Sequence, residues 1–269
     1  MKKVNVHILN NGDLQDRMEI DNMKLKDKVA LITGSSSGIG KAVALLFAEE
    51  GANVIICSNT SNEDGNIVLK EVIEKGSDAI YIQADLTKEN DIKNMFDKIK
   101  EKYGKLDILI NNAGRTFNIP FKEITEETII SDINTNLASA ILCSKYAVEL
   151  MNDEGWIVNT SSIRGIDYSG RAGIIGYCAA KAGINSFTKT LAMELAPKIY
   201  VNAVAPGFVN TNYMDTVTDE MKKAWLKNIP INKFIEPREI AEVYLMLATS
   251  KIFTGSIITS DGGYSLLNR

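Results

Sequence analysis

The sequence predicts an α/β protein, a single doubly wound domain in which helices flank a seven-stranded parallel sheet. Three observations lead to this fold class. Short apolar runs alternate with helical segments, each run is apolar throughout, and no linker, repeat or low-complexity tract interrupts them. Continuous apolar runs are typical of parallel strands buried on both faces. Alternation of strand and helix implies right-handed crossovers that place helices on both sides of the sheet.

The elements follow in chain order. The first strand is expected at 28–33, a β-branched run that ends in glycine, and the helix after it ends at Gly51, a typical helix stop. Further strands are expected at 53–57, 79–85, 106–112, 156–161, 200–206 and 256–261. Helices are expected up to Gly76, over 88–103, about 126–152, about 174–195, within 208–228 and over about 237–249. Residues 1–24 form a polar N-terminal extension, and 25–269 form the domain.

Composition excludes several classes of function. Thirty Lys and Arg face 34 Asp and Glu, a net charge of -4, so the basic surplus of proteins that bind nucleic acid or anionic membranes is missing. No apolar run approaches the roughly 20 residues of a membrane helix. Cys57, Cys143 and Cys178 are widely spaced, which predicts buried free thiols, no metal site and a cytoplasmic setting. The single histidine is His7, so any proton transfer further along the chain needs another group.

A glycine-rich turn, TGSSSGIG at 33–40, joins the first strand to the first helix. In this position Gly34 permits a tight turn, Gly38 lets the backbone approach a pyrophosphate, and Gly40 lets the helix pack on the sheet. The free N–H groups at the helix N-terminus attract phosphates. The turn therefore predicts a dinucleotide site that includes Ser36, Ser37 and Ile39; a tight turn without a ligand is the alternative.

The end of the second strand bears on the choice of dinucleotide. An acidic residue about 20 positions after the glycine turn would mark NAD, but Ser58 stands there, followed by Asn59. No carboxylate repels a 2′-phosphate, and no Arg or Lys attracts one. Because Ser58, Asn59, Thr60 and Ser61 can donate hydrogen bonds, NADP(H) is favoured over NAD(H).

Two further strand ends complete the predicted cofactor site. Asp85 ends the third strand, with Leu86 after it, and is expected to receive the adenine amino group; a cap for the helix from 88 is the alternative. The fourth strand ends in NNAG at 111–114, where Asn112, Ala113 and Gly114 would let the backbone lie close to the cofactor. A plain turn is the alternative there.

Together with these segments, motifs further along the chain resemble the classical short-chain dehydrogenase/reductase family, whose members share a Rossmann-type fold. The matching pieces are TGxxxGIG (33–40), DL (85–86), NNAG (111–114), TNL (135–137), SSIxG (161–165), YxxxK (177–181), PG (206–207) with Thr211, and DGG (261–263). They occur in order across about 25–263. The pattern is most similar to the 3-oxoacyl-[acyl-carrier-protein] reductase branch.

The resemblance implies an NAD(P)(H)-dependent enzyme that interconverts a carbonyl and a secondary alcohol. It assigns Tyr177 as the acid/base, Lys181 as its partner, Ser162 as the serine that orients the substrate, and Asn136 as the holder of a relay water. Cofactor contacts are also implied for Tyr177, Lys181, Pro206, Gly207, Val209 and Thr211. The alternatives are a core aromatic at Tyr177, a buried structural amide at Asn136 and a helix N-cap at Thr211.

The spacing of Tyr177 and Lys181 suits this chemistry. Positions i and i+4 share one face of a helix, so the ammonium is expected to lie beneath the phenol. A free tyrosine has a pKa of about 10, and a nearby ammonium would lower it. Ser162 would stabilise the negative charge that develops on the carbonyl oxygen.

One departure concerns the loop before Tyr177. Ser162 and Tyr177 are separated by 15 positions, about two more than is usual in the family, so an altered pocket mouth is expected. The longer loop also leaves Ser161 or Ser169 as alternatives to Ser162.

The substrate is less defined. Residues 208–236 are expected to form a lid, which carries Phe208, Tyr213, Met214, Trp225 and Phe234; an ordinary amphipathic helix is the alternative. Arg115, Arg164 and Arg171 could each meet a carboxylate or phosphate, or lie on the surface. Met193 and the acids of VELMNDEG disfavour docking of an acidic acyl carrier. A small ketone, sugar or polyol is therefore the rival substrate, and a non-catalytic dinucleotide sensor the rival function. The resemblance also implies a homotetramer.

Overall fold

The computed structural model describes residues 23–59, 62–166 and 170–267. Most of the expected N-terminal extension, with His7, lies outside the described residues. The same holds for Thr60, Ser61 and Ser169, so the structure does not bear on what was expected of them.

Seven parallel strands form one sheet in the order β3-β2-β1-β4-β5-β6-β7. The strands are β1 (Val29–Thr33), β2 (Asn53–Ser58), β3 (Ala79–Gln83), β4 (Ile108–Asn111), β5 (Gly155–Thr160), β6 (Ile199–Pro206) and β7 (Ile257–Ser260). β1, β4 and β5 are buried along their whole length, as continuous apolar runs predict. The predicted doubly wound sheet is confirmed.

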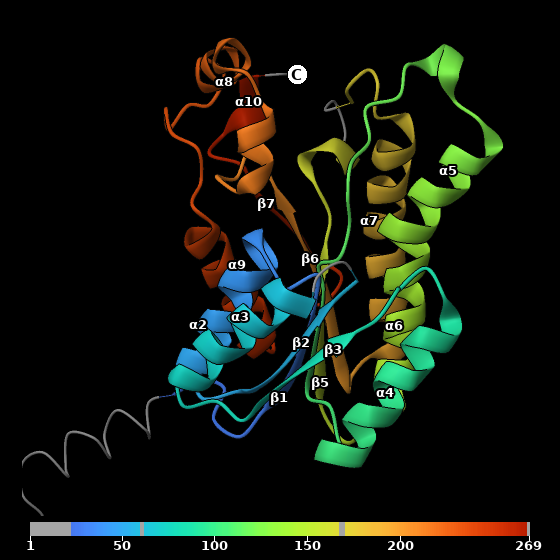
Figure 1. Cartoon of the computed structure of the whole chain (residues 1–269), viewed down its shortest axis with the longest axis vertical. Coiled ribbons are helices and arrows are strands. Elements are labelled where there is room, and N and C mark those ends of the chain that lie inside the picture. The colour runs from blue at the N-terminus through green and yellow to red at the C-terminus, as the bar shows by residue number, and fades with distance from the viewer. Residues whose placement is uncertain (1–22, 60–61, 167–169, 268–269) are drawn as a thin grey trace, which may run out of the picture.

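Helices cover both faces of the sheet (Figure 1). α2 (Gly38–Glu49), α3 (Asn62–Glu74) and α9 (Pro237–Thr249) lie on one face, and α4 (Glu89–Tyr103), α6 (Ser139–Val148) and α7 (Ile175–Leu195) lie on the other. Each face has its own core: Phe47 and Tyr244 are fully buried in the first, and Met95 and Leu109 in the second. The two layers hold the strand ends in fixed relative positions.

The expected long helix at about 126–152 is instead divided. α5 (Glu126–Ile133) begins at Thr125, whose side chain forms a capping box with Thr128. A π-helical segment (Asn134–Ala138) follows and continues directly into α6, which ends at Val148. π-Helical turns are often found at functional sites, and this one carries Asn136. Periodicity alone did not predict the division, because the chain stays helical through it.

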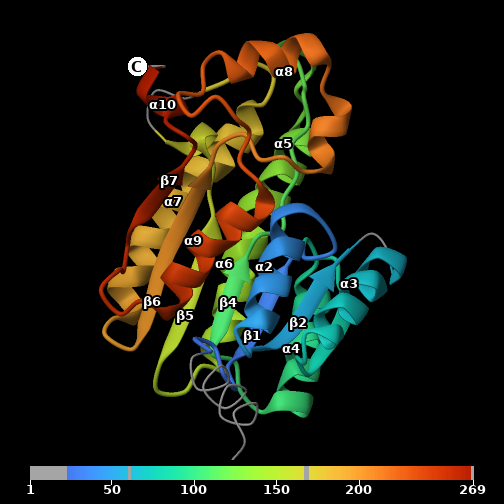
Figure 2. The same cartoon turned by 90° about the vertical axis from the view of Figure 1, so that its left-hand side faces the viewer.

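The remaining short elements gather at one end of the molecule. α8 (Asp219–Leu226) and α10 (Tyr264–Leu267) both lie at this end in the two views (Figures 1 and 2). α10 and the 3₁₀ turn Ile163–Gly165 were not predicted.

β1 pairs with β2 on one side and with β4 on the other. The chain runs from β1 through β2 to β3 in one direction and then from β4 to β7 in the opposite direction, so the strand order reverses beside β1. In such sheets ligands bind beside the carboxyl ends of the strands at the point of reversal. Gly34, Ser58 and Asn112 stand at or just after these ends. Among the described residues, no helix has the length and apolar character needed to cross a membrane. Within the same residues, no three His, Cys, Asp or Glu side chains are grouped to hold a metal ion.

Candidate active site

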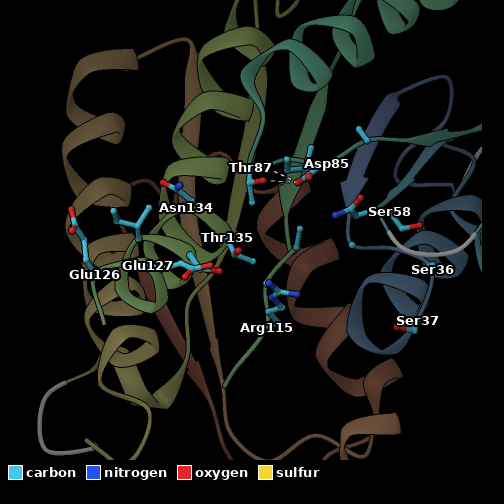
Figure 3. Close-up of a pocket in the computed structure, with 18 residues that line it drawn as sticks. Ser36, Ser37, Ser58, Asp85, Thr87, Arg115, Glu126, Glu127, Asn134 and Thr135 are labelled. Atoms are coloured by element: carbon cyan, nitrogen blue, oxygen red, sulfur yellow. Dashed lines mark hydrogen bonds between the residues drawn. The ribbon is translucent and has the colours of Figure 1, made fainter. Parts of the chain in front are cut away.

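Two adjoining hollows lie beside these strand ends. The first, here called the cofactor cleft, encloses about 800 Å³. It is lined by Gly34, Ser36, Ser37, Ser58, Asn59, Asp85, Leu86, Ala113 and Gly114, so it joins four predicted segments (Figure 3). The second, the catalytic pocket, encloses about 400 Å³ and is lined by Gly38, Ile39, Asn112, Ser162, Tyr177, Lys181, Pro206, Gly207, Val209 and Thr211. Gly34, Ser37 and Gly114 border both hollows.

The glycine turn has the geometry of a phosphate cradle. Gly34 and Gly38 adopt φ of +64° and +55°, which non-glycine residues rarely do. A Cβ on Gly34 would lie 2.8 Å from the Cα of Ala113, and one on Gly40 would overlap the carbonyl oxygen of Gly34. At the start of α2 the Ser37 side chain makes no capping hydrogen bond, which leaves the N–H groups of the first turn for an anion. The turn therefore fits a bound dinucleotide.

Asn112 holds the turn in place, a role that its sequence position did not reveal. Its Nδ2 donates to the carbonyl oxygens of Thr33 and Gly34, at 3.0 Å each, and its backbone N–H donates to the Thr33 Oγ1 at 2.9 Å. The side chain thus ties the end of β4 to the end of β1. This contact fixes the floor shared by the cleft and the pocket.

We expect Asn112→Ala to lower the free energy of unfolding by about 1–3 kcal/mol, because two carbonyl groups lose their donor. Cofactor affinity should fall with it, since the turn is no longer held. Urea unfolding and a cofactor titration measure the two effects. Asn66→Ala is a control, because the Asn66 side chain donates to the Asn62 carbonyl at the exposed start of α3, away from the turn. Unchanged stability in Asn112→Ala would contradict the assigned role.

The end of β2 carries neither a carboxylate nor a cation. The Ser58 Oγ shares a hydrogen bond of 3.1 Å with the Tyr81 hydroxyl, and Gln83 donates to the Asn59 carbonyl oxygen. Arg115 is the only cation among the described residues that line the cleft, and it stands across the cleft from Ser58 (Figure 3). The hydrogen-bond partners described for Ser58 and Asn59 are thus a neutral hydroxyl and a neutral amide.

Asp85 lies in the cleft but does not cap α4. Its Oδ1 accepts hydrogen bonds from the backbone N–H and the hydroxyl of Thr87, at 3.1 and 2.7 Å (Figure 3). The N-cap position of α4 is Lys88 instead. These hydrogen bonds, together with Lys88 nearby, hold the pKa of Asp85 below its usual value despite some burial. An ionised acceptor therefore faces the expected position of the adenine.

Ser162, Tyr177 and Lys181 meet in the catalytic pocket. Ser162 precedes the 3₁₀ turn, and its Oγ accepts a hydrogen bond of 3.1 Å from the Arg164 N–H. Tyr177 and Lys181 stand in the first two turns of α7, with the Lys181 Nζ 5.6 Å from the centre of the Tyr177 ring. Lys181 is 3% exposed and donates to the Thr160 carbonyl oxygen at 2.7 Å. The predicted i, i+4 arrangement is present.

The expected lowering of the Tyr177 pKa by Lys181 is not found. Burial raises the pKa of Tyr177, while hydrogen bonds with Ser162 and Thr116 and the charge of Arg164 act in the opposite direction. Burial also lowers the pKa of Lys181 to about 8. Desolvation has the largest effect on the pKa of both groups. Tyr177 is therefore held as a neutral phenol, which has a proton to donate.

Asn136 lies behind the pocket rather than in its lining. Its Oδ1 accepts from the Arg115 N–H at 3.0 Å, and its Nδ2 donates to the carbonyl oxygens of Arg115 and Asp132. A Cβ on Gly114 would lie 2.7 Å from the Asn136 Oδ1 and 3.5 Å from the Lys181 Nζ. Because Gly114 has no side chain, the Asn136 amide and the Lys181 ammonium can both lie close to it. The hydrogen bonds are those of a structural amide, the alternative considered above.

The geometry also bears on two alternatives from the sequence: Ser161 in place of Ser162, and an N-cap role for Thr211. The Ser161 Oγ donates to the Asn185 Oδ1 at 2.6 Å, so its hydroxyl is bonded within the protein. Thr211 precedes a 3₁₀ turn, Asn212–Thr216, but its side chain makes no capping hydrogen bond. Its methyl group lies opposite Gly38, where a Cβ would come within 3.3 Å of it. The Ser161 hydroxyl is therefore less available to a substrate than that of Ser162, and the Thr211 side chain does not act as an N-cap.

Two residues near the site were missed at the level of sequence. Thr116, which follows the NNAG turn by two positions, hydrogen-bonds Tyr177. Asp132 is 4% exposed on α5, and its Oδ1 has no partner among the described residues. Burial raises the pKa of Asp132, against the opposing charge of Arg115. Neither residue belongs to a recognisable local pattern, so only the fold brings them to the site.

A dinucleotide cradle beside a Ser–Tyr–Lys pocket defines an NAD(P)-dependent oxidoreductase. The family model described as enoyl-(acyl carrier protein) reductase matches residues 34–265. The 3-oxoacyl-[acyl-carrier-protein] reductase FabG of Thermotoga maritima is 40% identical over 246 residues, 90% of this chain and 99% of that protein. FabG of Staphylococcus aureus is 38% identical over 241 residues, 88% of this chain and 97% of the relative.

Solved structures agree. A short-chain type dehydrogenase/reductase from Mycobacterium marinum is 34% identical with a TM-score of 0.85, over 92% of this chain and 99% of that one. A short chain dehydrogenase from Burkholderia cenocepacia, in complex with NADP, is 31% identical with a TM-score of 0.86, over 90% of this chain and 99% of that one. The chain belongs to the short-chain dehydrogenase/reductase family. It is an NAD(P)-dependent enzyme that interconverts a carbonyl and an alcohol.

Proposed function

We propose that the protein uses NADP(H) to reduce a carbonyl compound, with Tyr177 as the proton donor. The observation that supports this most strongly is the meeting of Ser162, Tyr177 and Lys181 in one pocket that opens onto the cofactor cleft. A bound nicotinamide would supply the hydride to the carbonyl carbon. The oxygen then gains negative charge, and the Tyr177 hydroxyl delivers its proton there. Ser162 donates a hydrogen bond to the same oxygen and stabilises that charge.

Lys181 and Asn136 support the proton donor. The buried Lys181 ammonium stabilises the negative charge that Tyr177 carries after proton transfer. Asn136 fixes the Arg115 backbone and, through Gly114, the floor beneath Lys181. We assign it the role of a positioning residue, next to which a relay water would bind.

The preference for NADP(H) over NAD(H) rests on the end of β2. Ser58 stands where a carboxylate would repel a 2′-phosphate, and the hydroxyls of Ser36 and Ser37 line the same cleft. Hydroxyl groups can donate to a phosphate without adding charge. The NADP-bound relative from Burkholderia is consistent with this choice.

Two substrate classes remain in competition. The FabG relatives favour a 3-oxoacyl thioester. The surface favours a small ketone, sugar or polyol instead, because docking of an acidic carrier needs a basic patch. Here Met193 is 83% exposed at the place where such a patch would be expected, and Glu149 and Asp153 are exposed after α6.

Titration with NADPH and NADH, followed by a panel of thioesters, ketones and sugars, tests the proposal. We expect tighter binding of NADPH and consumption of that cofactor with at least one class. Equal or tighter binding of NADH would overturn the cofactor preference. Binding without consumption across the panel would favour the sensor alternative.

The pKa of Lys181 predicts the pH dependence of reduction. Its folded pKa of about 8 means that the ammonium is lost as pH rises through about 8, while Tyr177, whose pKa is raised, keeps its proton. kcat/KM should therefore fall tenfold per pH unit above this value. A profile of kcat/KM from pH 6 to 10 measures this decline. Lys181→Arg, which stays charged, should turn over more slowly but show no decline at high pH. A flat wild-type profile to pH 9.5 would contradict the assigned role of the Lys181 ammonium.

Three broader features belong to the same proposal. Residues 208–236 act as a lid, supported by Phe208, Tyr213, Met214 and Trp225 in the pocket wall; Phe234 is not part of that wall. The free thiols of Cys57, Cys143 and Cys178 suit a reducing, cytoplasmic setting. The active unit is a homotetramer, and a monomer in sedimentation would reject that assembly.

A further inference from the structure

Arg115 stands where the cofactor cleft meets the catalytic pocket. It lines both hollows, as do Gly34, Ser37 and Gly114. Gly34 and Ser37 belong to the glycine turn, where the phosphates of a dinucleotide are expected. Figure 3 shows Arg115 on the other side of the cleft from Ser36 and Ser37. A dinucleotide that reaches from the cleft into the pocket therefore passes between the glycine turn and Arg115.

The backbone of Arg115 is held from both sides by Asn136. The Asn136 Oδ1 accepts a hydrogen bond of 3.0 Å from the Arg115 N–H, and its Nδ2 donates to the Arg115 carbonyl oxygen at 2.9 Å. Asn136 itself is 2% exposed within the π-helical segment. Because a buried amide fixes both polar backbone groups, the Arg115 side chain starts from a fixed place beside the two hollows.

The guanidinium of Arg115 is oriented and is available to a ligand. The side chain is exposed, and the guanidinium stacks on the ring of Phe117 at 4.3 Å. Within the described residues it makes no hydrogen bond and no ion pair. Stacking of this kind orients a guanidinium but leaves its N–H groups unused. These groups can therefore bind an anion in the cleft.

Asp132 attracts Arg115 without engaging it. The charge of Arg115 acts on the Asp132 carboxyl, which is buried on α5. The Asp132 Oδ1 nevertheless has no hydrogen-bond partner among the described residues. Gly176 at the start of α7 covers this carboxyl, since a Cβ there would overlap the Asp132 Oδ2. The carboxyl is thus enclosed by the two helices, and it does not take up the N–H groups of Arg115.

An anionic cofactor needs a cation in this cleft. Asp85, Glu126 and Glu127 place carboxylates in its lining, whereas Arg115 is the one Lys or Arg among the described residues that line it. Lys41, in the first turn of α2, is already paired with a glutamate. A diphosphate is negatively charged and is repelled by carboxylates. Arg115 is therefore the side chain that can offset this repulsion.

We propose that Arg115 binds the diphosphate of the cofactor from the side opposite the glycine turn. This inference rests on the proposed binding of NADP(H) across the two hollows. Arginine suits this role because its planar guanidinium matches two phosphate oxygens at once. The diphosphate is common to NADPH and NADH, so Arg115 strengthens the binding of both, whereas the end of β2 distinguishes between them.

Three compounds test which phosphate Arg115 binds. NADPH, NADH and ADP-ribose all contain the diphosphate, but only NADPH has a 2′-phosphate, and ADP-ribose has no nicotinamide. Equilibrium titration of each, with no carbonyl compound present, gives its Kd. We expect Arg115→Gln to raise all three Kd values at least about tenfold and by similar factors, because a charged, two-pronged contact is lost. Arg115→Lys should lose less, because it keeps the charge but not the planar pair of donors.

Arg238→Gln is the matched control. Arg238 pairs with Glu49 and lines neither hollow, so the three Kd values should stay at the wild-type level. Urea unfolding of Arg115→Gln should match wild type, which separates lost binding from lost stability. Added salt should weaken binding more in wild type than in Arg115→Gln, because screening acts on a charge that the variant lacks.

The outcomes separate this contact from the reduction. Unchanged Kd values in Arg115→Gln would overturn the role of Arg115 and leave the reduction standing. A loss confined to NADPH would also overturn it, since Arg115 would then meet the 2′-phosphate instead. The titrations need no turnover, so the expected losses in an enzyme that reduces no carbonyl would support the diphosphate contact and count against the reduction.

Discussion

Tyr177→Phe is expected to lower kcat about 10²- to 10⁴-fold while cofactor binding stays within a few-fold of wild type. This range is the usual contribution of a general acid. The ring of Tyr177 remains to fill the pocket, so only the hydroxyl and its hydrogen bonds with Ser162 and Thr116 are lost. Steady-state turnover and a cofactor titration on the same sample measure the two effects.

Tyr146→Phe provides the matched control for this change. The Tyr146 hydroxyl donates to Glu89 at 2.8 Å on the surface, between α6 and α4. Loss of that hydroxyl should leave turnover unchanged. If Tyr177→Phe kept more than a tenth of wild-type kcat, Tyr177 would not be the proton donor, and the core-aromatic alternative would stand.

Gly34→Ala is expected to weaken cofactor binding at least tenfold. Two costs combine at this position. A φ of +64° costs an alanine about 1–2 kcal/mol, and its Cβ would lie 2.8 Å from the Cα of Ala113, where backbone must move. Crowding of this kind costs roughly 1–3 kcal/mol more. The displaced backbone belongs to the floor of the cofactor cleft, so the loss should appear in cofactor affinity.

Gly104→Ala isolates the second cost. Gly104 has a φ of +69° at the end of α4, but a Cβ added there would have nothing within 4 Å of it. Both variants should therefore lose similar stability from the backbone conformation, and only Gly34→Ala should lose cofactor affinity. Equal affinity in the two variants would show that Ala113 and the turn can relax, and that the cradle is not rigid.

Much of the fold could be predicted because its signals are local. Continuous apolar strands such as β4 and β5, and glycines that end helices, depend on neighbouring residues only. The division of the expected helix around Asn136 could not be predicted, because the chain stays helical through it. The hydrogen bonds of Asn136 with the Arg115 backbone join residues 21 positions apart in the sequence, which a local pattern does not reveal.

The site shows the same limit. The glycine turn and the pair Tyr177 and Lys181 are short-range patterns, and the structure brings them to adjoining hollows. The raised pKa of Tyr177 and the lowered pKa of Lys181 could not be inferred from spacing, because both follow from burial. The contact of Thr116 with Tyr177 and the burial of Asp132 likewise depend on the packed helices. The direction of these pKa shifts, and the positions of Thr116 and Asp132, could therefore be found only from the three-dimensional arrangement.

Transfer of deuterium tests the central claim most directly. The enzyme is mixed with NADPH that carries deuterium at the transferable position and with the carbonyl compound that the substrate panel selects. Mass spectrometry then reads the alcohol product. Hydride transfer with proton donation by Tyr177 predicts one deuterium on the carbinol carbon, formed at a rate that collapses in Tyr177→Phe. Bound NADPH that gives no labelled alcohol with any member of the panel, or a labelled alcohol formed equally fast by Tyr177→Phe, would contradict it.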